Sequence, residues 1–95
     1  DPIDAERAHH FGLVNVLCDD GEALDKAMAL ADRVCANAPL AVRASRKVVL
    51  EATNAPDEVG WRMSMEGMAK AMQSADFSEG LTAFIEKRPP NWTGK

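Results

Sequence analysis

The sequence has no tyrosine, only two cysteines and no long uninterrupted apolar run. Two cysteines are too few for the disulfide framework of a small secreted domain. Neither Cys18 nor Cys35 has a second Cys or a His at metal-ligand spacing, so we expect two small buried apolar thiols and no metal site. Without about 20 consecutive apolar residues, no segment is expected to span a membrane. The acidic start differs from a signal peptide, and we expect a cytoplasmic protein.

Net charge and chain length further restrict the class of protein. The chain has 11 Lys and Arg against 15 Asp and Glu, a net charge of −4, so nucleic acid is not an expected partner. Its 95 residues are 46% hydrophobic and 27% charged, which is typical of one globular domain. A domain of this size buries only about 60–70% of the surface that its unfolded chain exposes. Its stability in isolation is therefore limited.

The pattern of capping residues, prolines and apolar spacings predicts helices. Asp4 is expected to cap a helix that Gly12 ends, and Pro39 separates two further helices. The segment Leu13–Leu17 favours an extended conformation but has no second strand to pair with. The predicted fold class is all-α, a small array of about five short helices. The expected helices cover approximately residues 4–11, 22–35, 40–53, 57–72 and 77–87.

Two aspartates are predicted to begin the last two helices. Asp57 follows Pro56 and is expected to be an N-cap. Asp76 and Glu79 have the spacing of a capping box, in which the first side chain and the fourth satisfy each other's backbone N–H groups. Pro89 and Pro90 are expected to stop the last helix and to leave residues 91–95 extended.

The fourth predicted helix carries a stripe of adaptable apolar side chains. Trp61, Met65, Met68 and Met72 recur at helical spacing. Methionine is flexible and fills irregular spaces. We favour a role in the core or in a subunit interface over contact with the hydrocarbon chain of a ligand.

No catalytic group can be assembled from the residue pattern. None of the serines or cysteines lies beside a His at useful spacing or in a nucleophile elbow. His9 and His10 are adjacent, so on a helix they point about 100° apart and cannot share a metal. Paired carboxylates occur only where helices begin, and capping explains them. We expect no catalytic and no metal-binding residue in this chain.

One cluster near the end of the last predicted helix suggests a ligand. Phe84 is followed by Lys87 and Arg88. The ring could stack on a nucleotide base and the ammonium could pair with a phosphate. Cations are also favourable at a helix C-terminus for electrostatic reasons alone, so both explanations stand at this point.

Three segments in order resemble the crotonase (enoyl-CoA hydratase/isomerase) family. Residues 4–15 resemble the small helix that leads into a Gly-Leu-Val segment, and residues 37–47 resemble the Asn-Ala-Pro signature that follows. Residues 74–94 resemble the family's C-terminal ending and are the most specific of the three. The resemblance implies that the chain is the C-terminal helical domain, which assembles subunits and covers the active site, without the N-terminal catalytic spiral domain.

The resemblance also implies a function. Family members process acyl-CoA thioesters, and hydration of a 2-enoyl-CoA is the default reaction; coenzyme A enters as part of the substrate, and no separate cofactor is expected. Phe84 and Lys87 match the family positions that approach the CoA adenine and phosphates, with Arg88 as an auxiliary. A homo-oligomer, trimer or hexamer, is implied for the full-length parent. The absence of tyrosine disfavours the naphthoate synthase branch.

A second hypothesis is a stand-alone helical interaction module without catalytic activity. The unpaired segment Leu13–Leu17 and the missing initiator Met favour the enzyme piece over this alternative.

Overall fold

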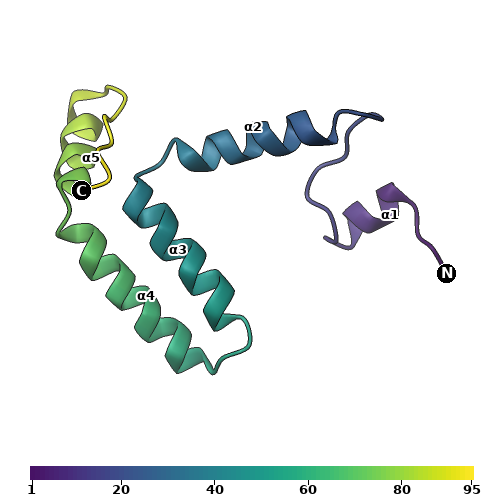
Figure 1. Cartoon of the computed structure of the whole chain (residues 1–95), viewed down its shortest axis with the longest axis horizontal. Helices are drawn as coiled ribbons and strands as arrows, with labels where there is room; N and C mark the ends of the chain where they lie inside the picture. Colours follow the sequence, from purple (N-terminus) through teal and green to yellow (C-terminus); the bar gives the residue numbers. More distant parts are fainter. The chain divides into compact units, whose positions relative to one another are not determined.

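The computed structural model describes residues 1–95 and contains five α-helices and no strand (Figure 1). The predicted all-α class is therefore confirmed. The chain divides into two compact units, Asp1–Arg33 and Val34–Lys95, each with its own internal packing. None of the helices is long and apolar enough to cross a membrane.

The first unit begins with a short capped helix, α1 (Ala5–His10). The Asp4 carboxylate accepts the N–H of Arg7 at 2.8 Å, as the sequence predicts. Gly12 has a left-handed φ of 73°, and Leu13 N–H donates to the carbonyl of Ala8 at 2.9 Å, which closes the helix end. Residues 13–17 form no strand and remain exposed, so the extended segment is left without a backbone partner strand.

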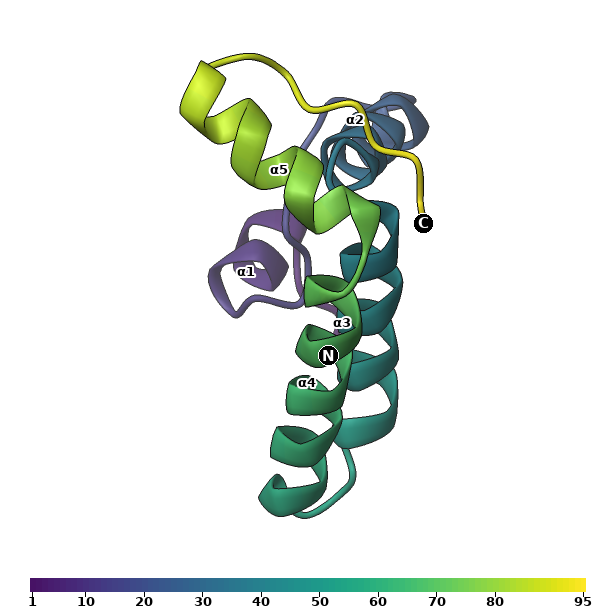
Figure 2. The same cartoon turned by 90° about the vertical axis from the view of Figure 1, so that its left-hand side faces the viewer.

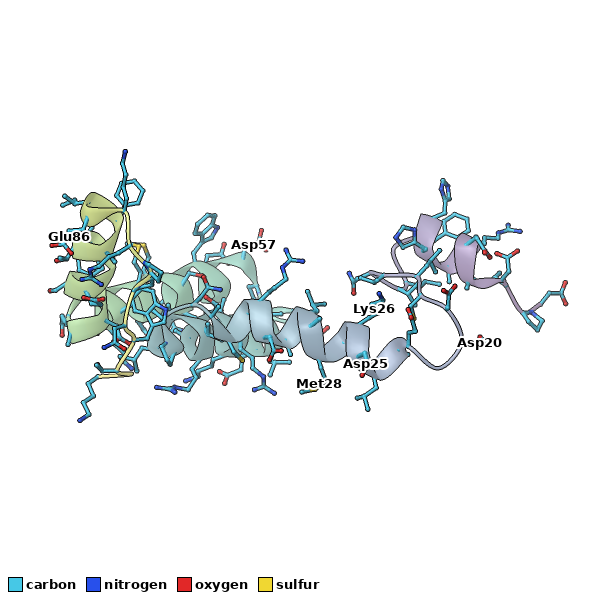
Figure 3. The ribbon with its side chains drawn as sticks, turned by 90° about the horizontal axis from the view of Figure 1, so that it is seen from above. Asp20, Asp25, Lys26, Met28, Asp57 and Glu86 are labelled. Atoms are coloured by element: carbon cyan, nitrogen blue, oxygen red, sulfur yellow. The ribbon has the colours of Figure 1, made fainter.

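The second helix, α2 (Ala23–Cys35), has the expected apolar face, but that face is not covered. Leu24 is 71% exposed and Met28 is 55% exposed. Figure 3 shows Asp25, Lys26 and Met28 projecting from this helix. Within the first unit, α1 and α2 do not pack against each other. The helix therefore depends on its own hydrogen bonds and on pairs such as Lys26–Glu22, which contribute only a few tenths of a kcal/mol.

In the second unit, α3 (Pro39–Ala52) packs against α4 (Asp57–Met72) (Figures 1 and 2). Pro39 lies in the first turn of α3, where its missing N–H has no consequence. Small residues set the close approach of the two helices. A Cβ on Gly67 would meet the Cβ of Ala44 at 3.3 Å, and one on Gly60 would meet that of Ala52 at the same distance.

The predicted role of Asp57 is wrong. Pro56 holds the N-cap position of α4, and Asp57 is the first helical residue, without a side-chain capping bond. The proline ring has a fixed φ and already gives the extended geometry that a helix start needs. Asp57 still favours the helix, because a negative charge in the first turn complements the helix dipole.

The last helix, α5 (Ala75–Glu86), begins two residues earlier than predicted. Ser74 is its N-cap, and the serine hydroxyl accepts the N–H of Phe77 at 3.1 Å. The capping box predicted for Asp76 and Glu79 is therefore wrong, because Ser74 already occupies the capping position. In Figures 1 and 2 the C-terminal tail leaves α5 and runs back along it.

Very little of the chain is buried. Only Ala83 and Asp76 are below a few per cent exposure, at 2% and 1%. The predicted stripe of α4 is also open to solvent, with Trp61 72% exposed. The stripe is therefore not part of a core formed within this chain.

The close contact between α3 and α4 predicts that Gly67→Val destabilises the second unit by about 1–3 kcal/mol. The Cβ of Ala44 is fixed to the backbone of α3, so α3 and α4 must separate by a few tenths of an ångström to admit the added side chain. Urea unfolding followed by circular dichroism measures the change. Ala69→Val on an exposed position of the same helix is the matched control, and it should change the free energy of unfolding by less than about 0.5 kcal/mol. Equal effects of the two substitutions would contradict this packing.

Candidate functional site

The two residues predicted to bind a nucleotide lie at the C-terminal end of α5. Phe84 is in the last turn of the helix and is 83% exposed, the most exposed of the large apolar side chains. Lys87 is the C-cap residue directly after Glu86, which is labelled in Figure 3. An aromatic ring and a cation thus lie three residues apart at one end of the helix, and both are open to solvent.

Lys87 has an unusual backbone conformation. Its φ of 54° and ψ of 41° are left-handed, and no other non-glycine residue has a positive φ. For an L-residue this conformation costs about 1–2 kcal/mol, and glycine usually occupies it. Arg88 N–H donates to the carbonyl of Ala83 at 3.1 Å, and this bond closes the helix end around Lys87. The sequence pattern does not predict this strained backbone conformation.

Arg88 is held by two carboxylates. Its guanidinium donates to both oxygens of Glu79, at 2.6 and 3.0 Å, and its Nε donates to Glu86 at 2.6 Å. The bonds from Arg88, followed by the backbone N–H of Asn91, lower the pKa of Glu79 to about 2, and the Glu79 carboxylate in turn raises the pKa of Arg88. Lys87, by contrast, forms no ion pair in the structure. Of the two predicted cations, only Lys87 is available to a ligand.

The Asp76 carboxylate fastens the C-terminal tail to the start of α5. It accepts the N–H of Thr93 at 2.7 Å, the hydroxyl of Thr93 at 3.0 Å and the N–H of Gly94 at 2.9 Å. The Thr93 backbone bond is the main reason why the pKa of Asp76 is lowered, although burial opposes it. The carbonyl oxygen of Lys95 accepts the N–H groups of Ala75 and Asp76 at 2.8 and 3.3 Å. Sequence reasoning missed this role, because the partners lie 17 and 18 residues away.

Trp92 attaches the tail at a second point. Its indole N–H donates to the carbonyl of Ala36 at 2.8 Å, in the segment that precedes α3. Its ring lies against Gly80, where an added Cβ would approach the ring to 3.1 Å. Glycine at this position of α5 thus makes room for the ring. The tail therefore connects the segment before α3 with the first half of α5.

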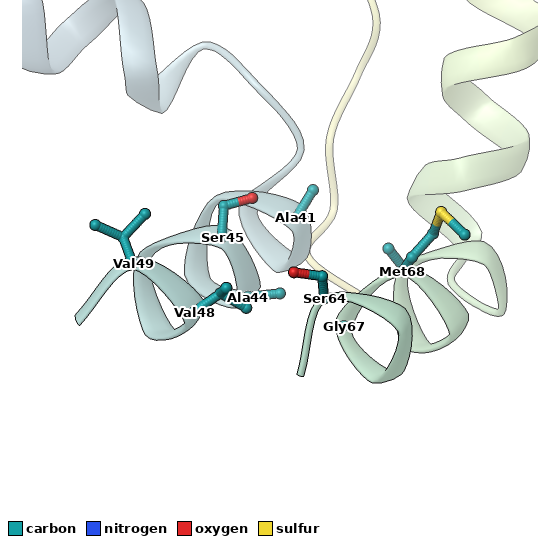
Figure 4. Close-up of a pocket in the computed structure, with 9 residues that line it drawn as sticks. Ala41, Ala44, Ser45, Val48, Val49, Ser64, Gly67 and Met68 are labelled. Atoms are coloured by element: carbon teal, nitrogen blue, oxygen red, sulfur yellow. The ribbon is translucent and has the colours of Figure 1, made fainter. Parts of the chain in front are cut away.

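Two apolar hollows in the second unit carry no reactive arrangement. One, of about 410 Å³, lies between α3 and α4 (Figure 4). Its lining is apolar or small and holds no charged side chain. A second hollow of about 250 Å³ is bounded by Trp92, Phe77 and Leu81, and its one carboxylate, that of Asp76, is occupied by the tail. The residues around the first are Ala41, Ala44, Ser45, Val48, Val49, Ser64, Gly67, Met68 and Ala71.

The other polar side chains bind groups in their own segment or have no reactive neighbour. The hydroxyls of Ser64 and Ser74 donate to the carbonyls of Gly60 and Ala71 within their own segments. Cys18 and Cys35 are free and exposed, so the expectation that they are buried is wrong. His10 packs edge-on against Phe11 at 5.3 Å between ring centres. No group of three His, Cys, Asp or Glu side chains is placed to hold a metal ion.

Comparison with known proteins gives a consistent result. The model of the family described as enoyl-CoA hydratase/isomerase matches residues 1–95. The enoyl-CoA hydratase EchA19 of Mycobacterium tuberculosis is 38% identical over 93 residues, which are 98% of this chain and 35% of that protein. A carnitinyl-CoA dehydratase of Salmonella paratyphi A is 35% identical over 97 residues, covering 98% of this chain and 37% of the relative.

A solved structure gives the same result for the fold. The crystal structure of enoyl-CoA hydratase EchA1 from Mycobacterium marinum has a TM-score of 0.88 and 44% identity, and the match covers 100% of this chain and 38% of that one. The chain thus spans 35–37% of the length of the curated relatives that it matches.

The two tail carboxylates predict that acid releases the C-terminal tail. Both folded-state pKa values lie below the ordinary values, so the stability that the carboxylates contribute is full above about pH 4.3. It is lost as the pH falls towards the Glu79 pKa of about 2. Amide hydrogen exchange measured by NMR should show faster exchange at Asn91, Thr93 and Gly94 over this range.

The Val42 amide is the internal control for that titration, because it donates to the backbone carbonyl of Ala38 at 3.0 Å and no carboxylate caps α3. Protection of the tail amides that stays constant from pH 5 to pH 2 (roughly the span of the two titrations) would contradict the carboxylate clamp.

Proposed function

Since the chain belongs to the enoyl-CoA hydratase/isomerase family, we propose that residues 1–95 form the C-terminal helical part of an acyl-CoA-processing enzyme. The proposed reaction is hydration of a 2-enoyl-CoA. The names of the two curated relatives, an enoyl-CoA hydratase and a carnitinyl-CoA dehydratase, both combine a CoA ester with addition or removal of water. The chain matches about a third of each relative, which supports a role as one part of such an enzyme.

The observation that carries the proposed role of this part is the exposed ring beside an unpaired lysine. In the proposal, the Phe84 ring stacks on the adenine of CoA and the Lys87 ammonium pairs with a phosphate. The chain is acidic overall, so a local cation is needed to attract the nucleotide. Arg88 does not share this role, because Glu79 and Glu86 already neutralise it.

The chemical step is proposed to take place outside these 95 residues. Hydration of an enoyl thioester needs N–H donors for the oxygen that becomes an enolate-like oxyanion, and carboxylates that activate water and move protons. In the proposal, an N-terminal catalytic spiral domain supplies both. The carboxylates of Asp76 and Glu79 are engaged with the tail and Arg88 and are not available for proton transfer. CoA enters as part of the substrate, and no further cofactor is proposed.

The uncovered apolar surface supports a role in assembly. Within the second unit, Trp61 of α4 is 72% exposed and Ile85 of α5 is 77% exposed. Contiguous exposed apolar faces are typical of surfaces that a partner covers. We propose that the N-terminal domain and further copies of the chain, in a cytoplasmic trimer or hexamer, cover the helices. A stand-alone interaction module remains the alternative.

The isolated 95-residue chain is predicted to show no hydration of crotonyl-CoA, because it supplies no water-activating group in this proposal. The loss of the enoyl thioester absorbance measures the reaction. Turnover by the purified chain would refute the proposal that the chemical step takes place outside residues 1–95. Light scattering of the same sample should show association, since the apolar faces are open. A monomer at high concentration would contradict the assembly role.

In the complete enzyme that carries residues 1–95, Lys87→Ala is predicted to weaken CoA binding about tenfold, the effect of losing one charge-assisted bond to phosphate. Binding of pantetheine, which lacks the nucleotide, should not change. Titration calorimetry with both compounds measures the difference. Lys70→Ala, which removes another exposed lysine, is the matched control. Equal losses for CoA and pantetheine would refute the phosphate role.

A further inference from the structure

The left-handed lysine at the end of α5 is held in place by its neighbours on both sides. Glu86 and Arg88 flank Lys87 and are joined to each other by a 2.6 Å bond. Arg88 is also bound by both oxygens of Glu79, which lies nine residues earlier in the chain, in the first half of α5. The Glu79 carboxylate additionally accepts the N–H of Asn91 at 2.7 Å, which fixes the chain beyond Arg88. The backbone of Lys87 therefore has little freedom to leave its strained conformation.

A helix end alone does not explain this arrangement. Pro89 and Pro90 already prevent the helix from continuing. Glycine would adopt the same left-handed conformation without strain, as it does at Gly12 after α1. Backbone strain that is held in place by several surrounding bonds is typical of functional residues, and Lys87 has both features.

We propose that Glu79, acting through Arg88, is a positioning residue that holds Lys87 in its left-handed conformation so that the ammonium meets the phosphates of the CoA nucleotide. This inference rests on the nucleotide-binding role proposed above and adds a residue that does not itself touch the ligand. The backbone angles of Lys87 set the direction in which its Cα–Cβ bond leaves the helix end. If the Glu79–Arg88 bonds are lost, Lys87 is free to relax, and the cation is no longer fixed beside Phe84.

The test compares three variants of the complete enzyme: Lys87→Gly, Glu79→Gln and the double substitution. Lys87→Gly removes both the cation and the strain. We expect its melting temperature to rise by about 2–4 °C, while CoA binding weakens about tenfold. A purely structural helix end would gain stability and lose no affinity. A melting temperature that does not rise would overturn the strain on which the proposal depends.

Glu79→Gln keeps the side-chain shape but weakens the bonds to Arg88. We expect CoA binding to weaken about three- to fivefold and pantetheine binding to stay unchanged. In the Lys87→Gly background, Glu79→Gln should change CoA affinity no further, because its effect passes through the lysine. Additive effects on affinity would overturn the positioning role. Glu66→Gln, which affects the exposed Arg62–Glu66 pair on α4, is the matched control.

The two proposals fail differently in this set. If Lys87→Ala and Lys87→Gly both keep the parent CoA affinity, the nucleotide-binding role itself is refuted. If both weaken CoA binding while Glu79→Gln does not, Lys87 binds the nucleotide without help, and only the positioning role is refuted.

Discussion

The hydrogen bonds of the Asp76 carboxylate are the interaction on which the position of the C-terminal tail depends. This carboxylate is the one buried charged group, and burial of a charge is costly unless donors surround it. Three donors from Thr93 and Gly94 meet that requirement and bring the tail against the start of α5. The tail then runs within reach of Glu79 and of Ala36, where Asn91 and Trp92 bind. Hydrogen bonds to buried and half-buried polar groups, and not an apolar core, therefore hold the tail against α5.

The apolar faces of two helices are left open to solvent. The faces of α2 and α4 have the spacing of core helices, yet they remain exposed. Contact between α3 and α4 is made by alanine and glycine, which contribute close approach and little buried area. This combination agrees with the proposal that other parts of a larger protein cover these helices.

Most of the fold could be predicted because its determinants are local. Asp4, Gly12 and Pro39 act on their own or adjacent turns, and the helices they define are confirmed. Asp57 and Asp76 were misjudged because a neighbour, Pro56 or Ser74, took the capping position. The tail could not be predicted, since Asp76 meets partners far along the chain. Phe84 and Lys87 were predicted from their residue types and from a family resemblance, and their role stays a prediction. The left-handed backbone of Lys87 becomes visible only in the structure.

The return of the tail to the start of its own helix has a practical meaning for protein engineering. The oxygen of Lys95 accepts from Ala75 and Asp76, so a purification tag or fluorophore fused after Lys95 would sit directly on the first turn of α5. Such a fusion would pull on Thr93 and Gly94 and, through the tail, on the Asn91–Glu79 bond next to Arg88. Labels for binding studies belong elsewhere on the molecule, for example on the exposed Cys18 thiol, which lies in the other structural unit.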